Sequence, residues 1–252
     1  MSSEDSISDS PGGASSRKTA LVTGGAKRVG RELALALARS GMNVAFTFRE
    51  SVAEASDTAE AIEALGVRSL TLEMDVRDEK SVHRAVAATT VLFGGLDLLV
   101  NNAAVFESAP LDEISVEQWD RMFETNTRGP FLMAREALPY LKSARGRIVN
   151  LGSLGGMHPW ATHAHYCASK AALHMLTQTM AKAFAPEVSV NCVAPGYIEL
   201  DGATAEAAHF ARKTPMGRNG TAAAVAEAVL FFAHGPHFVT GQILAVDGGL
   251  GL

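Results

Sequence analysis

Cysteine and long apolar runs are scarce in this sequence of 252 residues. Its two cysteines, Cys167 and Cys192, cannot build the disulfide framework that holds small secreted domains together. The most apolar stretches, such as residues 96–105, are interrupted by polar side chains, so we expect no transmembrane helix and no membrane partner. Residues 1–16 are acidic and lack an apolar core, which is not typical of a secretory signal. Cytoplasmic residence is therefore the expectation.

Positively charged residues are also few, since the chain has 22 Lys and Arg residues and 27 Asp and Glu residues. The net charge of -5 gives no electrostatic reason to expect a nucleic-acid partner. His163, His165 and His174 have no Cys or carboxylate at a metal-binding spacing, so no metal site is expected.

The chain does contain a regular alternation of β-rich and helical segments. Hydrophobic residues make up 47% of it and glycines number 23, which is typical of a globular chain with a core. Strands that alternate with helices require a mostly parallel sheet with right-handed crossovers. We predict a disordered tail at 1–16, then one Rossmann-type doubly wound α/β domain at 17–252 with a seven-stranded sheet and helices on both faces. The predicted strands are 19–23, 43–48, 67–74, 96–101, 147–151, 188–193 and 242–246, and the predicted helices include 53–65, 80–93, 116–141 (bent or divided by Pro130), 164–184 and 222–232.

A glycine-rich turn, TGGAKRVG at residues 23–30, joins the first predicted strand to the first helix. Such a turn lets the backbone approach a pyrophosphate, and the helix N-terminus offers free N–H groups and a positive dipole. Tight strand–helix turns also need glycine without any ligand, so the turn alone is a weak indication. Its place after the first strand favours a dinucleotide site.

Tyr166 and Lys170 lie four residues apart on a predicted helix, so their side chains share one face. A Lys cation beside a phenol favours the phenolate and lowers the Tyr pKa from about 10, which makes the acid usable near neutral pH. A Tyr and a Lys also fall four apart by chance. Two further polar residues accompany the pair, since Ser153 lies thirteen positions before Tyr166 and Asn126 lies forty positions before it.

These segments, in their order along the chain, resemble the motifs of the short-chain dehydrogenase/reductase family. The glycine-rich turn resembles the family's T-G-x-x-x-G-x-G, except that Arg28 replaces the middle glycine, a variant similar to that of pteridine reductases. NNAA at 101–104 is similar to N-N-A-G, NTRGP at 126–130 to N-x-x-x-P, and YCASK at 166–170 to Y-x-x-x-K. The resemblance covers nearly the whole chain after residue 17 and implies a nicotinamide-dependent oxidoreductase with a small-molecule substrate.

The resemblance also implies a role for each catalytic residue. Tyr166 donates a proton as hydride arrives from the nicotinamide, and Lys170 lowers the Tyr pKa and binds the nicotinamide ribose. Ser153 hydrogen-bonds the reacting substrate atom, while Asn126 holds a water in the proton relay. Leu200 stands where the family often has a Thr that binds the carboxamide. The implied cofactor-binding residues are Gly24, Lys27, Arg28, Val29, Gly30, Arg49, Ser51, Asp75, Val76, Asn102, Ala103, Ala104, Tyr166, Lys170, Pro195, Gly196 and Ile198.

The residues after the second predicted strand bear on the choice of cofactor. An NAD site usually places an acid there for the ribose 2′-hydroxyl, but Phe48 occupies that position. Arg49 and Ser51, with the cations of the glycine-rich turn, can hold a 2′-phosphate through charge-assisted hydrogen bonds, so we expect NADPH. Glu50 argues against this choice unless it points away from the phosphate. Alternatively, Arg49 and Glu50 merely form a solvated loop.

Phe106 bears on the substrate. In pteridine reductases an aromatic residue at this position stacks on the pterin, so Phe106 and Arg28 indicate reduction of a pterin-like C=O or C=N group. Phe106 can equally be an apolar anchor of its loop, and Ser153 stands where some pteridine reductases carry Asp. The expected substrate-binding residues are Phe106, Ser153 and Tyr166, with substrate-facing loops at 155–160 and 197–210.

Three alternatives to a pteridine reductase stay open. Two lie within the family: a 3-oxoacyl-carrier-protein reductase and a reductase of another small ketone. The third is a regulator that binds NADPH without turnover. Relatives pair the long helices around Asn126 and Tyr166 and their C-terminal segments, which implies a homotetramer.

Overall fold

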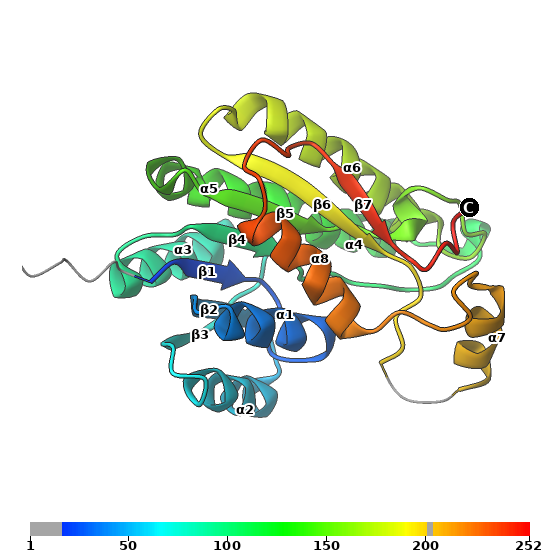
Figure 1. Cartoon of the computed structure of the whole chain (residues 1–252). Helices are drawn as coiled ribbons and strands as arrows, with labels where there is room; N and C mark the ends of the chain where they lie inside the picture. Colours follow the sequence, from blue (N-terminus) through cyan, green and yellow to red (C-terminus); the bar gives the residue numbers. More distant parts are fainter. Residues whose placement is uncertain (1–16, 201–203) are drawn as a thin grey trace, which may run out of the picture.

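The computed structural model describes residues 17–200 and 204–252, with the predicted seven-stranded sheet at its centre (Figure 1). All strands pair in parallel, in the order β3-β2-β1-β4-β5-β6-β7. The Rossmann-type doubly wound fold is therefore confirmed, and the tail predicted at 1–16 lies outside the described residues. The strand bounds are β1 Thr19–Val22, β2 Asn43–Phe48, β3 Ser69–Glu73, β4 Leu98–Asn101, β5 Arg147–Leu151, β6 Ser189–Pro195 and β7 Ile243–Val246.

The central strands are buried on both faces, and their alternate side chains enter two separate apolar cores. In β1, Ala20 and Val22 pack into one core, while Leu21 between them packs into the other. Burying apolar surface stabilises the fold by roughly 25 cal/mol per Å², and this free energy holds the helices against each face of the sheet. The first core is covered by α1 (Arg28–Arg39), α2 (Val52–Glu63) and α8 (Ala222–His234), the second by α3 (Glu79–Phe93), α5 (Gly129–Ala144) and α6 (Ala164–Phe184). Within the described ranges, no helix is long and apolar enough to cross a membrane.

The helix predicted at 116–141 is interrupted earlier than Pro130. Helix α4 (Val116–Phe123) ends at a π-helical turn, η2 (Glu124–Arg128), and α5 begins directly after it. Pro130 comes two residues after the π-turn, in the first turn of α5, so the missing N–H of the proline falls just past the interruption. The helix is therefore divided at the π-turn just before Pro130, and π-turns are often found at functional sites.

The prediction of a loop at 197–210 was wrong in part, because a helix, α7 (Ala205–Lys213), begins within this range. The Thr204 hydroxyl caps this helix by accepting the Ala207 N–H at 3.0 Å. Figure 1 shows α7 beside the sheet rather than against either face. Two short 3₁₀ turns, η1 (Leu111–Glu113) and η3 (Leu154–Gly156), lie in other loops.

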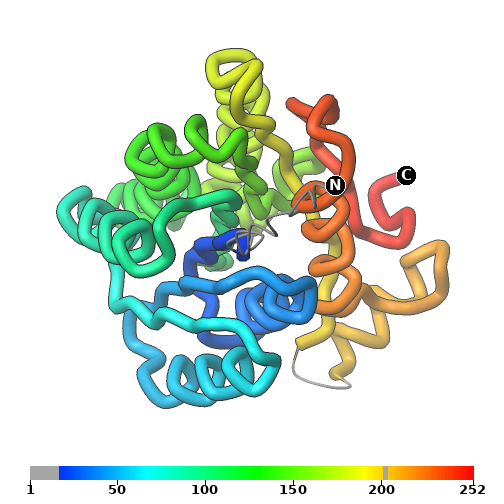
Figure 2. The backbone as a smooth tube through the Cα atoms, turned by 60° about the vertical axis from the view of Figure 1, so that its left-hand side comes forward, coloured from blue at the N-terminus to red at the C-terminus, as the bar shows by residue number. Residues whose placement is uncertain are grey.

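The two halves of the chain lie on opposite sides of the line between β1 and β4. Figure 2 shows the first half in blue and cyan on one side and the second half in green to red on the other. The strand order changes direction at this line, and open α/β sheets bind ligands outside the carboxyl ends of the strands at such a point. The glycine-rich turn after β1 and the segment after β4 therefore flank the expected binding edge.

Candidate active site

A cleft of about 510 Å³ lies along the carboxyl ends of β1, β2, β3 and β4. Its walls are the glycine-rich turn, the residues that follow the next three strands, and Tyr166 from α6. The predicted cofactor residues that line it are Gly24, Lys27, Arg28, Val29, Gly30, Arg49, Ser51, Asp75, Val76, Asn102, Ala103, Ala104 and Tyr166. Sequence reasoning missed Thr47, Met74, Val105 and Thr125, which also line it.

The glycine-rich turn has the form of a phosphate cradle. Gly24 has a φ of +65°, a conformation that glycine adopts without strain. Gly30 leaves no room for a side chain, because a Cβ there would lie 2.0 Å from the Gly24 oxygen. Lys27 precedes α1 and makes no side-chain cap, so the first N–H groups of the helix can serve an anion. The residues present thus fit the pyrophosphate of a dinucleotide.

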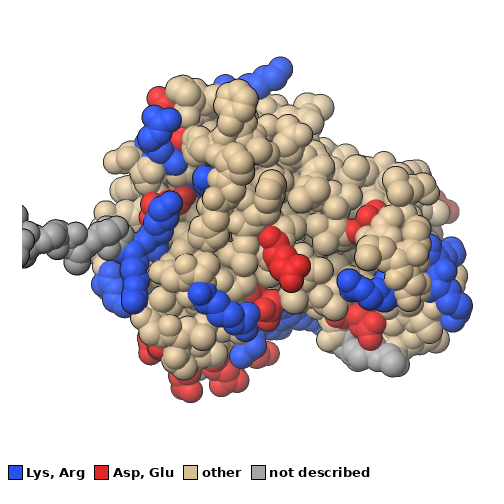
Figure 3. Space-filling model, in the orientation of Figure 1, with Lys and Arg blue, Asp and Glu red and all other residues tan. Residues whose placement is uncertain are grey.

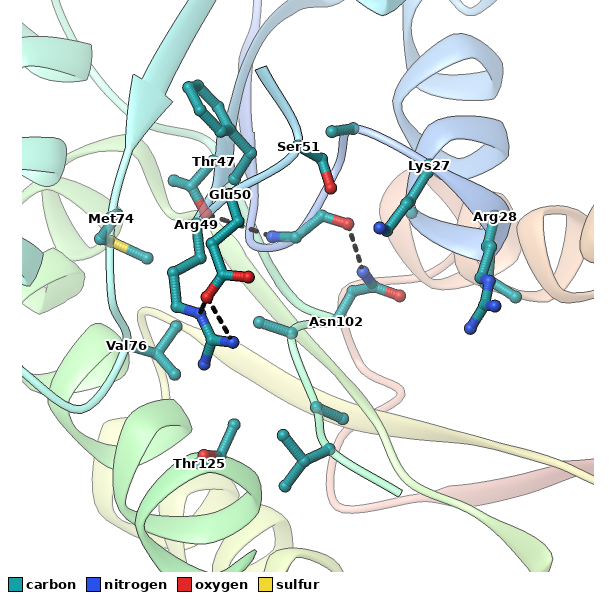
Figure 4. A pocket seen from close by; sticks show the side chains of 18 of the residues that line it. Lys27, Arg28, Thr47, Arg49, Glu50, Ser51, Met74, Val76, Asn102 and Thr125 are labelled. Carbon is teal, nitrogen blue, oxygen red and sulfur yellow. Dashed lines mark hydrogen bonds and ion pairs between the residues drawn. The ribbon is translucent and has the colours of Figure 1, made fainter. Parts of the chain in front are cut away.

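Hydrogen bonds between strand ends hold this cradle in place. The Thr23 hydroxyl accepts the Asn102 N–H at 3.0 Å and the Ala103 N–H at 2.9 Å. In return the Asn102 side-chain amide donates to the Thr23 carbonyl at 2.9 Å and to the Gly24 carbonyl at 3.0 Å, the second of which is dashed in Figure 4. On the other side, the Gly24 N–H donates to the Thr47 hydroxyl at 3.1 Å. Three neighbouring strands therefore fix the turn, which explains why Thr23 and Asn102 belong to the motifs.

Two cations of the turn face the cleft without an acidic partner among residues 17–200 and 204–252. Lys27 and Arg28 are both exposed and lie on the α1 side of the cleft (Figure 4). Arg28 takes the place of a glycine in the motif and has a φ of +52°, the left-handed conformation that favours glycine. The cation therefore occupies a position where the backbone is strained.

Arg49 pairs with Glu50 rather than pointing alone into the cleft. The Arg49 guanidinium contacts the Glu50 carboxylate through Nε and Nη2, both at 2.8 Å. Figure 4 shows the pair at the cleft wall opposite Lys27 and Arg28. Glu50 thus does not point away from the cleft, and it neutralises Arg49. Among the predicted phosphate ligands, the unpaired positive charge comes from the glycine-rich turn.

Asp75 and Val76 lie after β3, at the predicted adenine side of the cleft. Arg77 donates to both Asp75 carboxylate oxygens, at 2.6 to 3.1 Å, and its backbone N–H donates to one of them. The hydrogen bonds from Arg77 hold the pKa of Asp75 below its usual value. The carboxylate is therefore charged and fixed at neutral pH.

Helix α6 and the turn η3 bring Tyr166, Lys170 and Ser153 together. Burial raises the pKa of Tyr166, and a hydrogen bond with the Ser153 side chain opposes that rise. The expected lowering of the Tyr166 pKa by Lys170 is not found. Lys170 Nζ instead donates to the Leu151 carbonyl at 2.7 Å and lies 5.9 Å from the centre of the Tyr166 ring. Burial lowers the pKa of Lys170 itself to about 8.

Asn126 lies in the π-turn, and both ends of its side-chain amide are engaged. Its Oδ1 accepts the Val105 N–H at 2.9 Å, while Nδ2 donates to the Val105 carbonyl at 3.0 Å and the Ser169 hydroxyl at 3.1 Å. Asn126 therefore ties the segment after β4 to the helix that carries Tyr166. These hydrogen bonds give Asn126 a structural role, which is to hold the two segments together, beside the role in a proton relay that the sequence predicts.

Aromatic rings surround Tyr166. Phe106 stacks on His163 at 4.7 Å and meets the edge of Tyr166 at 4.8 Å, both measured between ring centres. The Trp160 ring lies nearly parallel to the Tyr166 ring at 6.1 Å. Phe106 remains 60% exposed, so it can still contact a ligand. The sequence singled out Phe106 as a substrate residue but gave His163 no role.

Four predicted cofactor residues do not line the cleft. Lys170 is buried behind Tyr166. Pro195 ends β6, and a Cβ at Gly196 would lie 2.7 Å from the Cβ of Asp247, so this turn packs against the C-terminal segment. Ile198 forms an isolated β-bridge with Gly220. Leu200, by contrast, does line the cleft.

Comparisons with known proteins agree with this geometry. A family profile described as enoyl-(acyl carrier protein) reductase matches residues 24–251. The 3beta-hydroxysteroid dehydrogenase 1 of Eggerthella lenta is 36% identical over 245 residues, covering 93% of this chain and 94% of that protein. The 3-oxoacyl-[acyl-carrier-protein] reductase FabG of Staphylococcus aureus is 35% identical over 240 residues, covering 92% and 98%.

Solved structures are similar over the same length. A dehydrogenase/reductase from Sinorhizobium meliloti has a TM-score of 0.89 and 35% identity, covering 92% of this chain and 94% of that chain. A blue fluorescent protein from a metagenomic library, in complex with NADPH, has a TM-score of 0.88 and 32% identity, covering 92% and 97%. The chain belongs to the short-chain dehydrogenase/reductase family. It is an oxidoreductase that uses a nicotinamide cofactor.

Proposed function

We propose that the protein reduces a C=O or C=N group with NADPH and that Tyr166 donates the proton. The observation that carries the proposal is that Tyr166 and the cationic glycine-rich turn line one cleft. A cofactor phosphate bound at the turn and a substrate bound near Tyr166 can then share a continuous space. The intact set of Asn126, Ser153, Tyr166 and Lys170 argues against a regulator that only binds NADPH.

The buried phenol suits the reductive direction. When bound, the nicotinamide supplies the hydride. Burial raises the pKa of Tyr166, so the phenol is protonated at neutral pH and can donate. Ser153 stabilises the phenolate that remains, since its hydrogen bond acts to lower that pKa. Lys170, with a pKa of about 8, is mostly cationic at neutral pH, and its ammonium is held behind Tyr166 by the Leu151 carbonyl.

The preference for NADPH rests on Lys27 and Arg28. Both line the cleft, and cations form strong charge-assisted hydrogen bonds with phosphate. Glu50 reduces the contribution of Arg49 because the two side chains pair at 2.8 Å. The similar blue fluorescent protein is in complex with NADPH, which supports the same cofactor here.

Two substrate classes are supported by different observations. A pterin-like ring is favoured by the exposed Phe106 beside Tyr166 and by Arg28 in the turn. A ketone is favoured by the relatives, one of which is named as a 3-oxoacyl-carrier-protein reductase and another as a hydroxysteroid dehydrogenase. In either case the aromatic rings around Tyr166 suit a substrate with a flat apolar part next to the reacting group.

Steady-state rates with dihydrobiopterin, dihydrofolate and an acetoacetyl thioester, each with NADPH and NADH, test the proposal. We expect turnover of at least one substrate with NADPH and a lower kcat/KM with NADH. Tyr166→Phe should remove most of the turnover and leave NADPH binding largely intact. Tight NADPH binding without turnover on any carbonyl or pterin would favour the regulator, and near-normal activity of Tyr166→Phe would overturn the mechanism.

A further inference from the structure

His174 lies one helical turn beyond Lys170 on α6 and is only 8% exposed. Tyr166, Lys170 and His174 are spaced by four residues, so they follow one another along one face of the helix. None of the sequence motifs includes this histidine. It nevertheless lies directly behind the residues that meet the substrate.

The segment that carries Ser153 wraps around the His174 imidazole. A Cβ at Gly152 would lie 2.2 Å from Nε2 of His174, and a Cβ at Gly156 would lie 2.6 Å from its Cε1. Protein interiors are too closely packed to relieve such overlaps without moving the chain. The imidazole therefore lies between the two glycines and shares that space with the Cys192 thiol, 2.6 Å from a Cβ at Gly152, and the Lys170 backbone, 2.8 Å from a Cβ at Gly156.

Hydrogen bonds join the imidazole to the same segment. The Ser153 N–H donates to Nε2 of His174 at 3.4 Å. Because a backbone N–H can only donate, Nε2 is the acceptor and the ring proton lies on Nδ1. Burial and then the Lys170 charge lower the pKa of His174 to about 4, so the ring keeps its acceptor at neutral pH.

The direction of the Ser153 hydroxyl depends on the backbone that His174 holds. That hydroxyl accepts the Gly155 N–H at 3.1 Å and acts on the Tyr166 phenol to lower its pKa. A rotation of the chain at Ser153 would move the hydroxyl relative to the phenol. Misplacing a catalytic group by about 1 Å can cost on the order of 100-fold in rate.

We propose that His174 is a positioning residue that fixes the Ser153 hydroxyl against Tyr166 by accepting the Ser153 N–H. The inference rests on the proposed reductase function and adds a residue that acts through Ser153 without touching the substrate. This role requires a hydrogen-bond acceptor at the position of Nε2, and any side chain that places an acceptor there should fulfil it.

Two substitutions separate this requirement from simple packing. The amide of His174→Gln reaches the position of Nε2 and can accept the Ser153 N–H, whereas His174→Asn is one methylene shorter and reaches only the position of Nδ1. We expect His174→Asn to lower kcat about tenfold, with KM and NADPH affinity within about twofold, and His174→Gln to stay within about threefold of the original kcat. Equal losses in the two variants would overturn the proposal.

The Tyr166 pKa gives a readout that does not need turnover. Titration of tyrosinate absorbance, with Tyr166→Phe subtracted to remove Tyr140 and Tyr197, should show a higher Tyr166 pKa in His174→Asn than in His174→Gln. The other titratable groups that face the phenol, Lys170 and the Cys167 thiol, are unchanged in both variants. An unshifted pKa in His174→Asn would contradict the proposal.

Thr177→Val is the matched control for lost stability. Thr177 is buried on the same helix and hydrogen-bonds with Asn150 and the Leu173 carbonyl, and with neither Ser153 nor Tyr166. It should lower the unfolding temperature without moving kcat or the Tyr166 pKa. A kcat loss in Thr177→Val as large as that in His174→Asn would assign the effect to folding and overturn the proposal. If the unmodified enzyme shows no turnover but the Tyr166 pKa still differs between His174→Asn and His174→Gln, the reductase function is disproved and the positioning role of His174 stands.

Discussion

Arg28 combines a cofactor-facing cation with a backbone conformation that usually belongs to glycine. Its φ of +52° costs a non-glycine residue about 1 to 2 kcal/mol, while glycine would cost about 0.5 to 1 kcal/mol in chain entropy. We expect Arg28→Gly to leave the free energy of unfolding within about 1 kcal/mol of the original and to weaken NADPH binding about threefold to tenfold. Fluorescence titration with NADPH and urea unfolding measure the two effects.

Arg145 provides the control, because it has a φ of +48° at the C-terminal end of α5 and does not line the cleft. Arg145→Gly makes the same backbone change and should leave NADPH affinity unaltered. Similar losses of affinity in both glycine variants would show that the cation of Arg28 is not a phosphate ligand.

Glu50 limits the selectivity for NADPH. Its carboxylate is 76% exposed and pairs with Arg49, and exposed pairs contribute at most about 1 kcal/mol. Glu50→Gln should free Arg49 for the 2′-phosphate and raise the NADPH-to-NADH ratio of kcat/KM about threefold. Glu54→Gln, an exposed acid in the first turn of α2, is the control. An unchanged ratio in Glu50→Gln would mean that Arg49 lies outside the phosphate site.

The buried His174 makes stability depend on pH. Its pKa falls from the usual 6.5 to about 4, so the unfolded chain binds a proton between these values while the folded chain does not. The stability is therefore complete above about pH 6.5 and falls as the pH is lowered toward 4, by up to about 3 kcal/mol. Urea unfolding at pH 7.5 and 5 should show a smaller pH effect in His174→Gln than in the original chain. Equal pH effects in the two proteins would refute this linkage.

At the scale of elements, the turn between β1 and α1 depends on close backbone contact. A Cβ at Gly30 would meet the Gly24 oxygen at 2.0 Å and Asn102 Nδ2 at 2.7 Å. Gly30→Ala should therefore displace the turn, lower the free energy of unfolding by about 1 to 3 kcal/mol and abolish cofactor binding. Gly95→Ala, where no atom lies within 4 Å of the added Cβ, should change neither property. Cofactor binding by Gly30→Ala with normal affinity would disprove the close packing.

The sequence predicted elements well where burial dictates the pattern. Strands β2 and β5 and helix α6 have the predicted bounds, because apolar periodicity and glycine breaks mark their ends. The π-turn and α7 were missed, since they depend on contacts such as those of Asn126 and on the Thr204 cap. Among the predicted site residues, motif spacing singled out Ser153 and Tyr166, which the structure brings together. The Arg49–Glu50 pair and the place of His174 depend on side-chain direction, which spacing does not encode.

At the scale of the whole molecule, two apolar areas on the surface of residues 17–200 and 204–252 bear on assembly. One is a groove of about 500 Å³ over α4, α5 and α6, whose apolar lining comes from Phe123, Phe131 and Leu176, with Phe131 41% exposed. Figure 3 shows the other, an area with few charges over β6 and β7, near which Phe238 is 99% exposed. A tetramer with dihedral symmetry uses two different interfaces, so two such areas support the predicted homotetramer.

Light scattering should give a mass about four times the 26.5 kDa of one chain. Phe131→Glu places a charge in the helical groove and should halve that mass. Val52→Glu, on the exposed side of α2, should leave it unchanged. A monomeric mass for the unsubstituted protein would exclude the tetramer.

The hydrogen bonds of Thr23 set the moment at which a newly made chain becomes able to hold its cofactor. The donors, Asn102 and Ala103, follow Thr23 by 79 and 80 positions. A ribosome-bound chain that ends within α2 carries the whole glycine-rich turn but lacks the strand that fixes it. Cofactor capture by a growing chain therefore has to wait for the β1–β4 pairing, and the first appearance of bound-nicotinamide fluorescence during synthesis would time that step.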